Sequence, residues 1–262
     1  MERTVVFFDI DMTLVGKDRK VPPDTLAAVR KLRENGHLAA ISTGRPYTHI
    51  EKGVLAIGFD GFVCECGAHV IYRGEDIFHA QPELPVCREM IELSRRTGMS
   101  PVYESEEGMF FDTRMPFAER TRIEREHYAA LGFDVDRDID DPDFRFDKFV
   151  VYQLPGNDIE TFCREAGKYF EIYGKEGGMW EMVPKGCSKG RGIERLCERL
   201  DIPPERCLAV GDGLNDAAMF QTCGHSAVMG DGDPAVFPLA EFISAGYAEG
   251  GVRNALEHFG LI

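Results

Sequence analysis

The chain has 262 residues, an ordinary apolar content of 44% and a formal net charge of −15. This charge argues against nucleic acid or an anionic membrane as the main partner, because both bind through basic surfaces. The sequence contains no apolar run of about 18 residues, the minimum for a membrane span, and no signal-peptide pattern. We therefore expect a cytoplasmic protein. Its eight cysteines include no C-x-x-C pair, so we also expect reduced thiols and no zinc site.

From the N-terminus, apolar runs alternate with segments of helical period, which is typical of an α/β fold with parallel strands. A buried strand is predicted at 4–8, a helix between Pro22 and Gly36, and a second strand at 38–42. The same rhythm returns near the C-terminus. The remaining predicted elements of this part are strands at 62–65, 207–211, 226–229 and 242–245, a helix at 214–223, and a helix face on Ile193, Leu196, Cys197 and Leu200.

The middle of the chain, Pro82–Val183, is different in character and is predicted to be a second domain inserted into a split α/β core. It contains an acidic, turn-rich run, 134–147, which we interpret as a solvated loop rather than a metal site. Its strands are expected to be antiparallel or mixed. They are predicted at 101–104, 109–112 and 149–153, with helices at 86–96, 116–131 and 158–169.

Four short runs carry chemistry, and the first is Asp9-Ile10-Asp11, directly after the first strand. Open parallel sheets bind ligands at the carboxyl ends of their strands. Two carboxylates at such an edge repel one another, and burying them is costly without a cation. The second run, Thr43-Gly44-Arg45, follows the second strand and combines a hydroxyl, a glycine and an arginine, the groups that recognise phosphate.

The third run places Lys189 at a helix start, where the helix already carries partial positive charge, so an anion or a carboxylate cluster is expected opposite it. The fourth, 211–216, puts Asp212 and Asp216 after another buried strand, an oxygen-rich set suited to Mg²⁺. Taken alone, each run is also compatible with a turn, a helix cap or a solvated lysine. Their joint placement at one sheet edge favours a single site.

In order and spacing, FFDIDMTLV, STGRP, KGCSKG and GDGLNDAAM resemble the four motifs of the haloacid dehalogenase-like (HAD) hydrolase superfamily. The insertion between the second and third motifs resembles the cap of Cof-type, class IIB sugar-phosphate phosphatases. The resemblance implies a Rossmann-like parallel-sheet core, 1–81 and 184–262, with an inserted α+β cap domain, 82–183. It also implies a Mg²⁺-dependent phosphatase acting on a small phosphorylated metabolite.

The roles that the resemblance implies are as follows. Asp9 is the nucleophile that forms an aspartyl-phosphate, and Asp11 is the general acid and base. Mg²⁺ is held by the Asp9 carboxylate, the Asp11 carbonyl and Asp212, with Asp216 behind them. The phosphate-binding residues are Thr43, Gly44, Arg45, Lys189 and Asn215. In the cap, Trp180 and Glu181 are candidate substrate contacts, although core packing is an equal alternative for Trp180, the only tryptophan.

Two departures from the family pattern concern the shape of the site. Met12 and Cys66 stand where the family usually has glycine and asparagine. Two alternatives to a phosphatase stay open, namely a phosphotransferase or phosphomutase with the same intermediate, and a catalytically silent binding protein. A dinucleotide-binding domain ranks last, because no G-x-G-x-x-G follows the first strand. The sequence indicates neither the physiological substrate nor an oligomeric state.

Overall fold

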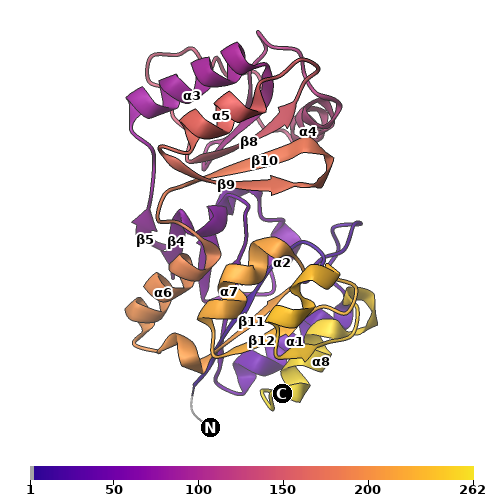
Figure 1. Ribbon diagram of the computed structural model, residues 1–262. Helices are drawn as coiled ribbons and strands as arrows, with labels where there is room; N and C mark the ends of the chain where they lie inside the picture. Colours follow the sequence, from indigo (N-terminus) through magenta and orange to yellow (C-terminus); the bar gives the residue numbers. More distant parts are fainter. Residues whose placement is uncertain (1–2) are drawn as a thin grey trace. The chain divides into compact units, whose positions relative to one another are not determined.

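The computed structural model describes residues 3–262, except the side chains of residues 175 and 176. The chain divides into two compact units. The core unit runs up to His79 and resumes at Ser188, and the inserted unit comprises Ala80–Cys187. Figure 1 labels the helices and strands of both units.

The core unit is built on an eight-stranded sheet of order β13-β12-β11-β1-β2-β3-β4-β5. All neighbours from β13 to β3 are parallel, whereas β4 and β5 continue the sheet as an antiparallel hairpin. This arrangement confirms the predicted α/β class with a parallel core. The strands are β1 (Val5–Phe8), β2 (Leu38–Ser42), β3 (Gly61–Cys64), β4 (His69–Tyr72), β5 (Glu75–His79), β11 (Cys207–Gly211), β12 (His225–Val228) and β13 (Phe242–Ile243).

Helices cover both faces of this sheet, as the ribbon shows (Figure 1). Val6 and Phe8 of β1 pack into the hydrophobic cluster that contains α1 and α8, whereas Val5 and Phe7 pack into the cluster of α6 and α7. A strand buried on both faces needs apolar residues at every position, which explains why VVFF shows no alternation. The helices are α1 (Pro23–Glu34), α2 (Lys52–Leu55), α6 (Lys189–Leu200), α7 (Ala217–Thr222) and α8 (Gly251–His258).

The strand order of the sheet changes direction at β1. Strands β2 and β3 follow on one side of β1, and β11 and β12 lie on its other side. Phe8, the last residue of β1, is level with Ile41 of β2 and Val210 of β11. The crevice that such a switch point creates at the carboxyl ends is the expected ligand site of an open α/β sheet.

The inserted unit contains a five-stranded sheet of order β7-β6-β8-β10-β9, in which every pair is antiparallel. Helices α3 and α5 pack on one face through Phe149 and Val151 of β8, and the segment around α4 packs on the other face through Val150 and Tyr152. The elements are α3 (Leu84–Thr97), β6 (Met99–Ser105), β7 (Gly108–Phe111), α4 (Glu119–Ala130), β8 (Lys148–Gln153), α5 (Ile159–Ala166), β9 (Phe170–Lys175) and β10 (Met179–Pro184).

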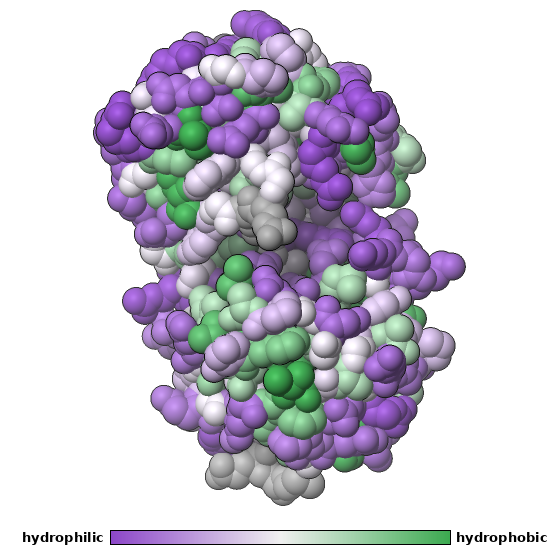
Figure 2. Space-filling model, turned by 45° about the vertical axis from the view of Figure 1, so that its right-hand side comes forward, coloured by the Kyte–Doolittle hydropathy of each residue, from purple (hydrophilic) through white to green (hydrophobic). Residues whose placement is uncertain are grey.

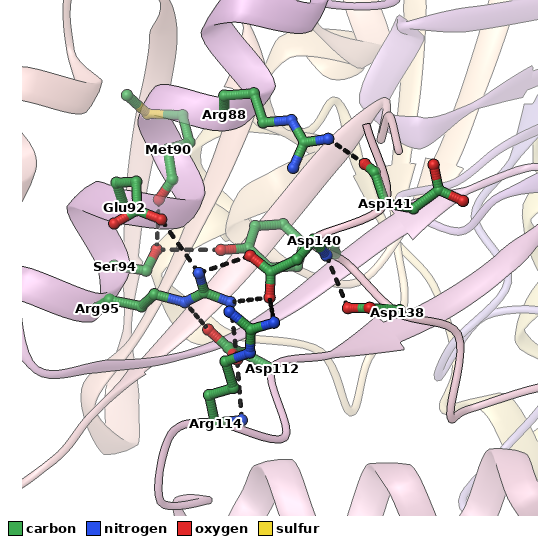
Figure 3. A network of polar contacts seen from close by, with 11 residues as sticks. Arg88, Met90, Glu92, Ser94, Arg95, Asp112, Arg114, Asp138, Asp140 and Asp141 are labelled. Carbon is green, nitrogen blue, oxygen red and sulfur yellow. Dashed lines mark hydrogen bonds and ion pairs between the residues drawn. The ribbon is translucent and has the colours of Figure 1, made fainter. Parts of the chain in front are cut away.

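The acidic run of the inserted unit is only partly a solvated loop. Arg95 of α3 donates to both oxygens of Asp140 at 2.8 and 2.9 Å, and its Nε donates to Asp112 at 2.7 Å. Arg114 also pairs with Asp140, at 2.8 Å. Figure 3 shows these arginines and carboxylates converging. The prediction of a solvated loop was therefore wrong at Asp140, because two arginines far away in sequence pair with it.

Several local predictions need correction. The hairpin of β4 and β5 and the strand β9 were not predicted. In the hairpin, polar residues such as His69, Asp76 and His79 interrupt the apolar pattern. The predicted helix at 214–223 begins as a 3-10 turn, Leu214–Asp216, before α7. Other 3-10 turns are Tyr47–His49, Glu65–Gly67, Glu176–Gly178, Pro204–Arg206, Pro234–Leu239 and Tyr247–Glu249.

Hydrophilic residues predominate on the surface seen in Figure 2, with hydrophobic residues singly or in small groups. Within residues 3–262, the large hydrophobic side chains that are clearly exposed are Ile123, Leu131, Tyr173, Leu214, Leu239 and Ile243. Among the described residues, no helix is both long and apolar enough to span a membrane.

Candidate active site

Asp9 stands at the carboxyl end of β1, and its backbone amide continues the sheet by donating to the carbonyl of Val210 at 2.9 Å. The chain then turns tightly, because the amides of Thr13, Leu14 and Val15 all donate to the carbonyl of Ile10. The Asp9 side chain is buried, whereas the side chain of Asp11 is 58% exposed.

Met12 lies within this turn in the left-handed region, with φ of 57°. A residue with a Cβ is destabilised there by roughly 1–2 kcal/mol, which is the physical reason that a glycine is expected at this position. Cys66 has the same conformation, with φ of 54°. Both departures from the family pattern therefore occur at positions of positive φ, and the chain tolerates side chains at each.

Lys189 is the first residue of α6 and is almost completely buried. Its Nζ donates to Oδ1 of Asp9 at 2.6 Å and to Oδ1 of Asp216 at 2.5 Å. Burial lowers the pKa of Lys189, but the charges of Asp216 and Asp9 outweigh it and raise the pKa overall. The carboxylates explain how a cation can occupy the positive end of a helix.

Asp216 organises the loop after β11. Its Oδ2 accepts hydrogen bonds from the amides of Asp212 at 2.8 Å and Gly213 at 3.0 Å, while its Oδ1 accepts from Lys189. A Cβ at Gly211 would lie 2.4 Å from Oδ2 of Asp216, so only glycine fits at the end of β11. With both oxygens engaged, Asp216 supports the position of Lys189 and of Asp212.

Three carboxylates, those of Asp9, Asp212 and Asp216, place oxygens within 4.8 Å of one another. Burial raises the pKa of Asp9 to about 7, since the opposing charge of Lys189 offsets only part of the effect. Burial and the charges of Asp9 and Asp216 raise the pKa of Asp212 to about 8. One ammonium does not neutralise this cluster.

A hard divalent cation fits the cluster well, because it prefers carboxylate oxygens and would supply the missing positive charge. Asp9 and Asp212 are the residues best placed to hold it. Among the described residues, none donates a hydrogen bond to the carboxylate of Asp212, whereas Oδ1 of Asp216 already accepts from Lys189 and its Oδ2 from two backbone amides.

The predicted phosphate-binding residues are placed differently from one another. Thr43 is buried at the end of β2, its amide donates to Val63 at 2.8 Å, and its Oγ1 accepts from the amide of Arg45 at 3.2 Å. Gly44 lies between them and is partly buried. Asn215 is exposed on the 3-10 turn, and no side-chain hydrogen bond to it is found within residues 3–262.

Arg45, a predicted phosphate-binding residue, already pairs with two carboxylates. Its Nε donates to Oδ2 of Asp11 at 2.9 Å, its NH2 donates to Oδ1 of Asp11, and its NH1 donates to Oε2 of Glu51 at 2.7 Å. Glu51 in turn accepts from Arg19 at 3.2 Å. Sequence reasoning missed both Glu51 and Arg19, because nothing in their local pattern distinguishes them from solvated surface charges.

Trp180 and Glu181 belong to β10 of the inserted unit. Trp180 packs against the hydrophobic cluster of α3 and α5, and a Cβ at Gly174 would lie 2.9 Å from its ring, so the indole lies closely on the neighbouring strand. Glu181 is buried and accepts from Nζ of Lys148 at 3.0 Å, and Lys148 also pairs with Glu104 at 2.9 Å. Burial raises the pKa of Glu104 to about 7.

Comparison with known proteins agrees with the geometry of the core unit. The family model of haloacid dehalogenase-like hydrolases matches residues 6–256. The HMP-PP phosphatase of Serratia proteamaculans is 24% identical over 259 residues, which cover 96% of this chain and 92% of that protein.

Two solved structures show the same fold. A hypothetical protein from Geobacillus kaustophilus HTA426 superposes with a TM-score of 0.85 at 27% identity, with both chains covered completely. The HAD subclass IIB sugar phosphatase BT4131 superposes with a TM-score of 0.82 at 22% identity, over 99% of this chain and 100% of that one. The resemblance seen in the four motifs is thus confirmed, and the chain belongs to the haloacid dehalogenase-like hydrolase family as an enzyme of the phosphatase type.

Proposed function

We propose that this enzyme is a Mg²⁺-dependent phosphatase that releases phosphate from a small phosphorylated metabolite through an aspartyl-phosphate on Asp9. The observation that carries the proposal is the buried Asp9 carboxylate. Lys189 contacts it at 2.6 Å, and one of its oxygens lies within 4.8 Å of an oxygen of Asp212 and of Asp216. A nucleophile must stay ionised, and the ammonium of Lys189 favours that state.

In the first step, an oxygen of Asp9 attacks phosphorus, the bond from phosphorus to the leaving oxygen breaks, and that oxygen takes a proton from Asp11. In the second step, Asp11 takes a proton from water as the water attacks the aspartyl-phosphate, so that Asp9 is restored and phosphate leaves. General acid–base help of this kind is typically worth roughly 10²–10⁴-fold. Lys189 keeps Asp9 in place and offsets charge on the phosphoryl oxygens.

Mg²⁺ would be held by the carboxylates of Asp9 and Asp212 and the backbone carbonyl of Asp11, with Asp216 behind them. When bound, it would neutralise charge on the oxygens of the transferring group. Thr43, Gly44 and Asn215 line the same strand ends and are proposed to bind the phosphoryl group. Arg45 is not included among these phosphate-binding residues, because its guanidinium donates to Asp11 and Glu51 instead.

The substrate class rests on the relatives. The relative from Serratia proteamaculans is named as a phosphatase of HMP-PP, and BT4131 is named as a sugar phosphatase. For this chain we propose a sugar phosphate or a comparably small phosphorylated metabolite. The inserted unit, predicted at 82–183, is proposed as the cap that reads the leaving group, with Glu181 and Trp180 as the residues first to be tested.

The decisive experiment is a phosphate-release screen over hexose and pentose phosphates, flavin mononucleotide, pyridoxal phosphate and para-nitrophenyl phosphate, with and without Mg²⁺. We expect Mg²⁺-dependent release that Asp9→Asn abolishes. Near-normal rates in Asp9→Asn would refute the nucleophile. Phosphate retained on an organic acceptor would instead indicate a phosphotransferase or phosphomutase, and no turnover of any compound would indicate a catalytically silent protein.

A further inference from the structure

Four charged side chains of the core unit form a network in which the charge alternates in sign, and Asp11 is at one end of it. Arg19 contacts Glu51 at 3.2 Å, Glu51 contacts Arg45 at 2.7 Å, and Arg45 contacts both oxygens of Asp11. The Arg45 side chain is only 13% exposed, whereas that of Asp11 is 58% exposed. Within this network of ion pairs, the Arg45 guanidinium is therefore mostly buried, and the Asp11 carboxylate is accessible to solvent.

The pairing of Arg45 with Asp11 has a chemical consequence. A guanidinium that donates to both oxygens fixes the plane of a carboxylate, which gives directional control that a lysine would not. It also occupies the oxygen that must hand a proton to the leaving group. Catalysis by Asp11 therefore requires a guanidinium that stays close while it releases one of these two hydrogen bonds.

Glu51 is placed to provide that restraint. It binds NH1 of Arg45, the one terminal nitrogen that does not face Asp11, and it is itself tied to Arg19. Burial lowers the pKa of Arg45, but hydrogen bonds and charges from Asp11 and Glu51 outweigh it, so both carboxylates stabilise the same guanidinium through different nitrogens. The backbone of Arg45 is fixed as well, because its carbonyl accepts from the amide of Glu65 at 3.0 Å.

We propose that Glu51 is a positioning residue for the general acid: by holding NH1 of Arg45 it keeps the Nε edge of the guanidinium beside Asp11 while a hydrogen bond to that carboxylate is released. This inference rests on the proposed phosphatase function. It predicts an effect confined to the step in which the leaving group needs a proton. An alkoxide leaving group needs that proton, whereas para-nitrophenolate leaves without much help.

The test compares kcat/KM for the best sugar phosphate of the screen with kcat/KM for para-nitrophenyl phosphate, since kcat/KM reports the steps up to departure of the leaving group. Glu51→Gln keeps the size of the side chain and removes its charge. We expect it to lower kcat/KM about tenfold for the sugar phosphate, a part of the roughly 10²–10⁴-fold of acid catalysis. The loss should be at least about fivefold smaller for the aryl phosphate. An equal loss on both substrates, or none, would overturn the proposal.

A double-mutant cycle shows whether Glu51 acts through Arg45. In an Arg45→Lys background, Glu51→Gln should change the sugar-phosphate rate by less than about twofold, because the forked contact is already lost. An undiminished effect in that background would also overturn the proposal. Glu257→Gln is the matched control, since it removes an exposed pair with Arg253 at 3.7 Å, and it should leave both substrates unaffected.

Two further results keep the inference separate from the proposed function. Glu51→Asp retains the charge and should recover most of the sugar-phosphate rate, which a failure to fold would not allow. If the wild-type enzyme releases no phosphate from either compound, the proposed function fails and this inference fails with it. If the wild type is active and the ratio of the two substrates is the same in Glu51→Gln, only the role of Glu51 is refuted.

Discussion

Lys189 and Asp216 form an ion pair at 2.5 Å in which both side chains are almost completely buried. The pair closes a chain of contacts from the start of α6 to the loop after β11, because Asp216 also accepts from the amides of Asp212 and Gly213. The cation thus has a structural task in addition to the one proposed on Asp9.

We expect Lys189→Met to lower the free energy of unfolding by about 3–5 kcal/mol, because it leaves two buried carboxylates without their counterion. Turnover should be lost as well. Urea denaturation of the whole protein measures the change in unfolding free energy, and a phosphate-release assay measures the loss of turnover.

Lys31→Met is the matched control, because Lys31 is exposed and lies 3.9 Å from Glu34. It should change stability by less than about 1 kcal/mol. A Lys189→Met variant as stable as this control would show that the buried pair is not needed for the fold.

Magnesium binding should depend on pH through Asp9 and Asp212. Their pKa values are raised to about 7 and about 8 from the ordinary value of 3.8, so the folded state retains protons that the unfolded chain has lost. Without metal, the contribution of these two carboxyls to stability is therefore fully present below the unfolded pKa of about 4 and is lost as pH rises through about 7 and about 8. Mg²⁺ competes with these protons.

The increase in Tm that Mg²⁺ produces should consequently be larger at about pH 8.5 than at about pH 6. Thermal unfolding at the two pH values, with Mg²⁺ and with a chelator, measures it. Asp212→Asn should reduce the increase at both. A Tm increase that is independent of pH, or that survives in Asp212→Asn, would contradict the assignment of these ligands.

In the inserted unit, Arg95 should be the side chain on which the 134–147 segment depends. It contacts Asp112, whose side chain has no exposed surface, and Asp140 (Figure 3). Arg95→Met should destabilise this unit by about 3–5 kcal/mol, since it leaves a buried charge unpaired. Arg122→Met removes an exposed pair with Glu126 and should cost less than about 1 kcal/mol by the same denaturation measurement. Similar costs for both variants would refute the anchoring role.

Helix ends offer a test of backbone strain. Asp201 ends α6 with φ of 54°, whereas Gly98 ends α3 with φ of 70°. Asp201→Gly should stabilise the core unit by about 0.5–1 kcal/mol, and Gly98→Ala should destabilise the inserted unit by about 1 kcal/mol or more. Chemical denaturation of the two variants measures both changes in the free energy of unfolding. The idea fails if Asp201→Gly lowers the stability.

The residues that could be predicted from the sequence are those whose position is set by a buried strand. β2 and β11 were predicted with the bounds observed, because a parallel strand covered on both faces is a short apolar run with a turn signal after it. Since such runs end at one sheet edge, a common site for Asp9, Thr43 and Asp212 could be predicted without knowing the strand order.

The partners of charged side chains could not be predicted in this way. Arg45 has the same local sequence whether it binds phosphate, Asp11 or Glu51, and only the packing of the turn after β1 decides between them. Lys148 lies just before the predicted strand at 149–153, and nothing in its local sequence indicates burial, yet it is buried between Glu104 and Glu181 from two neighbouring strands. Strand register, which the sequence does not encode locally, determines such pairs.

The pairing of β1 with β11 has a kinetic consequence. Val5 pairs with Cys207, so the central strands meet only after almost the whole chain has been brought back on itself, at an entropic cost that grows with the length of the loop. The strands of the inserted unit pair within Met99–Pro184 and are less remote from one another. Trp180, the only tryptophan, reports on that unit, so during refolding its fluorescence should recover before phosphatase activity returns.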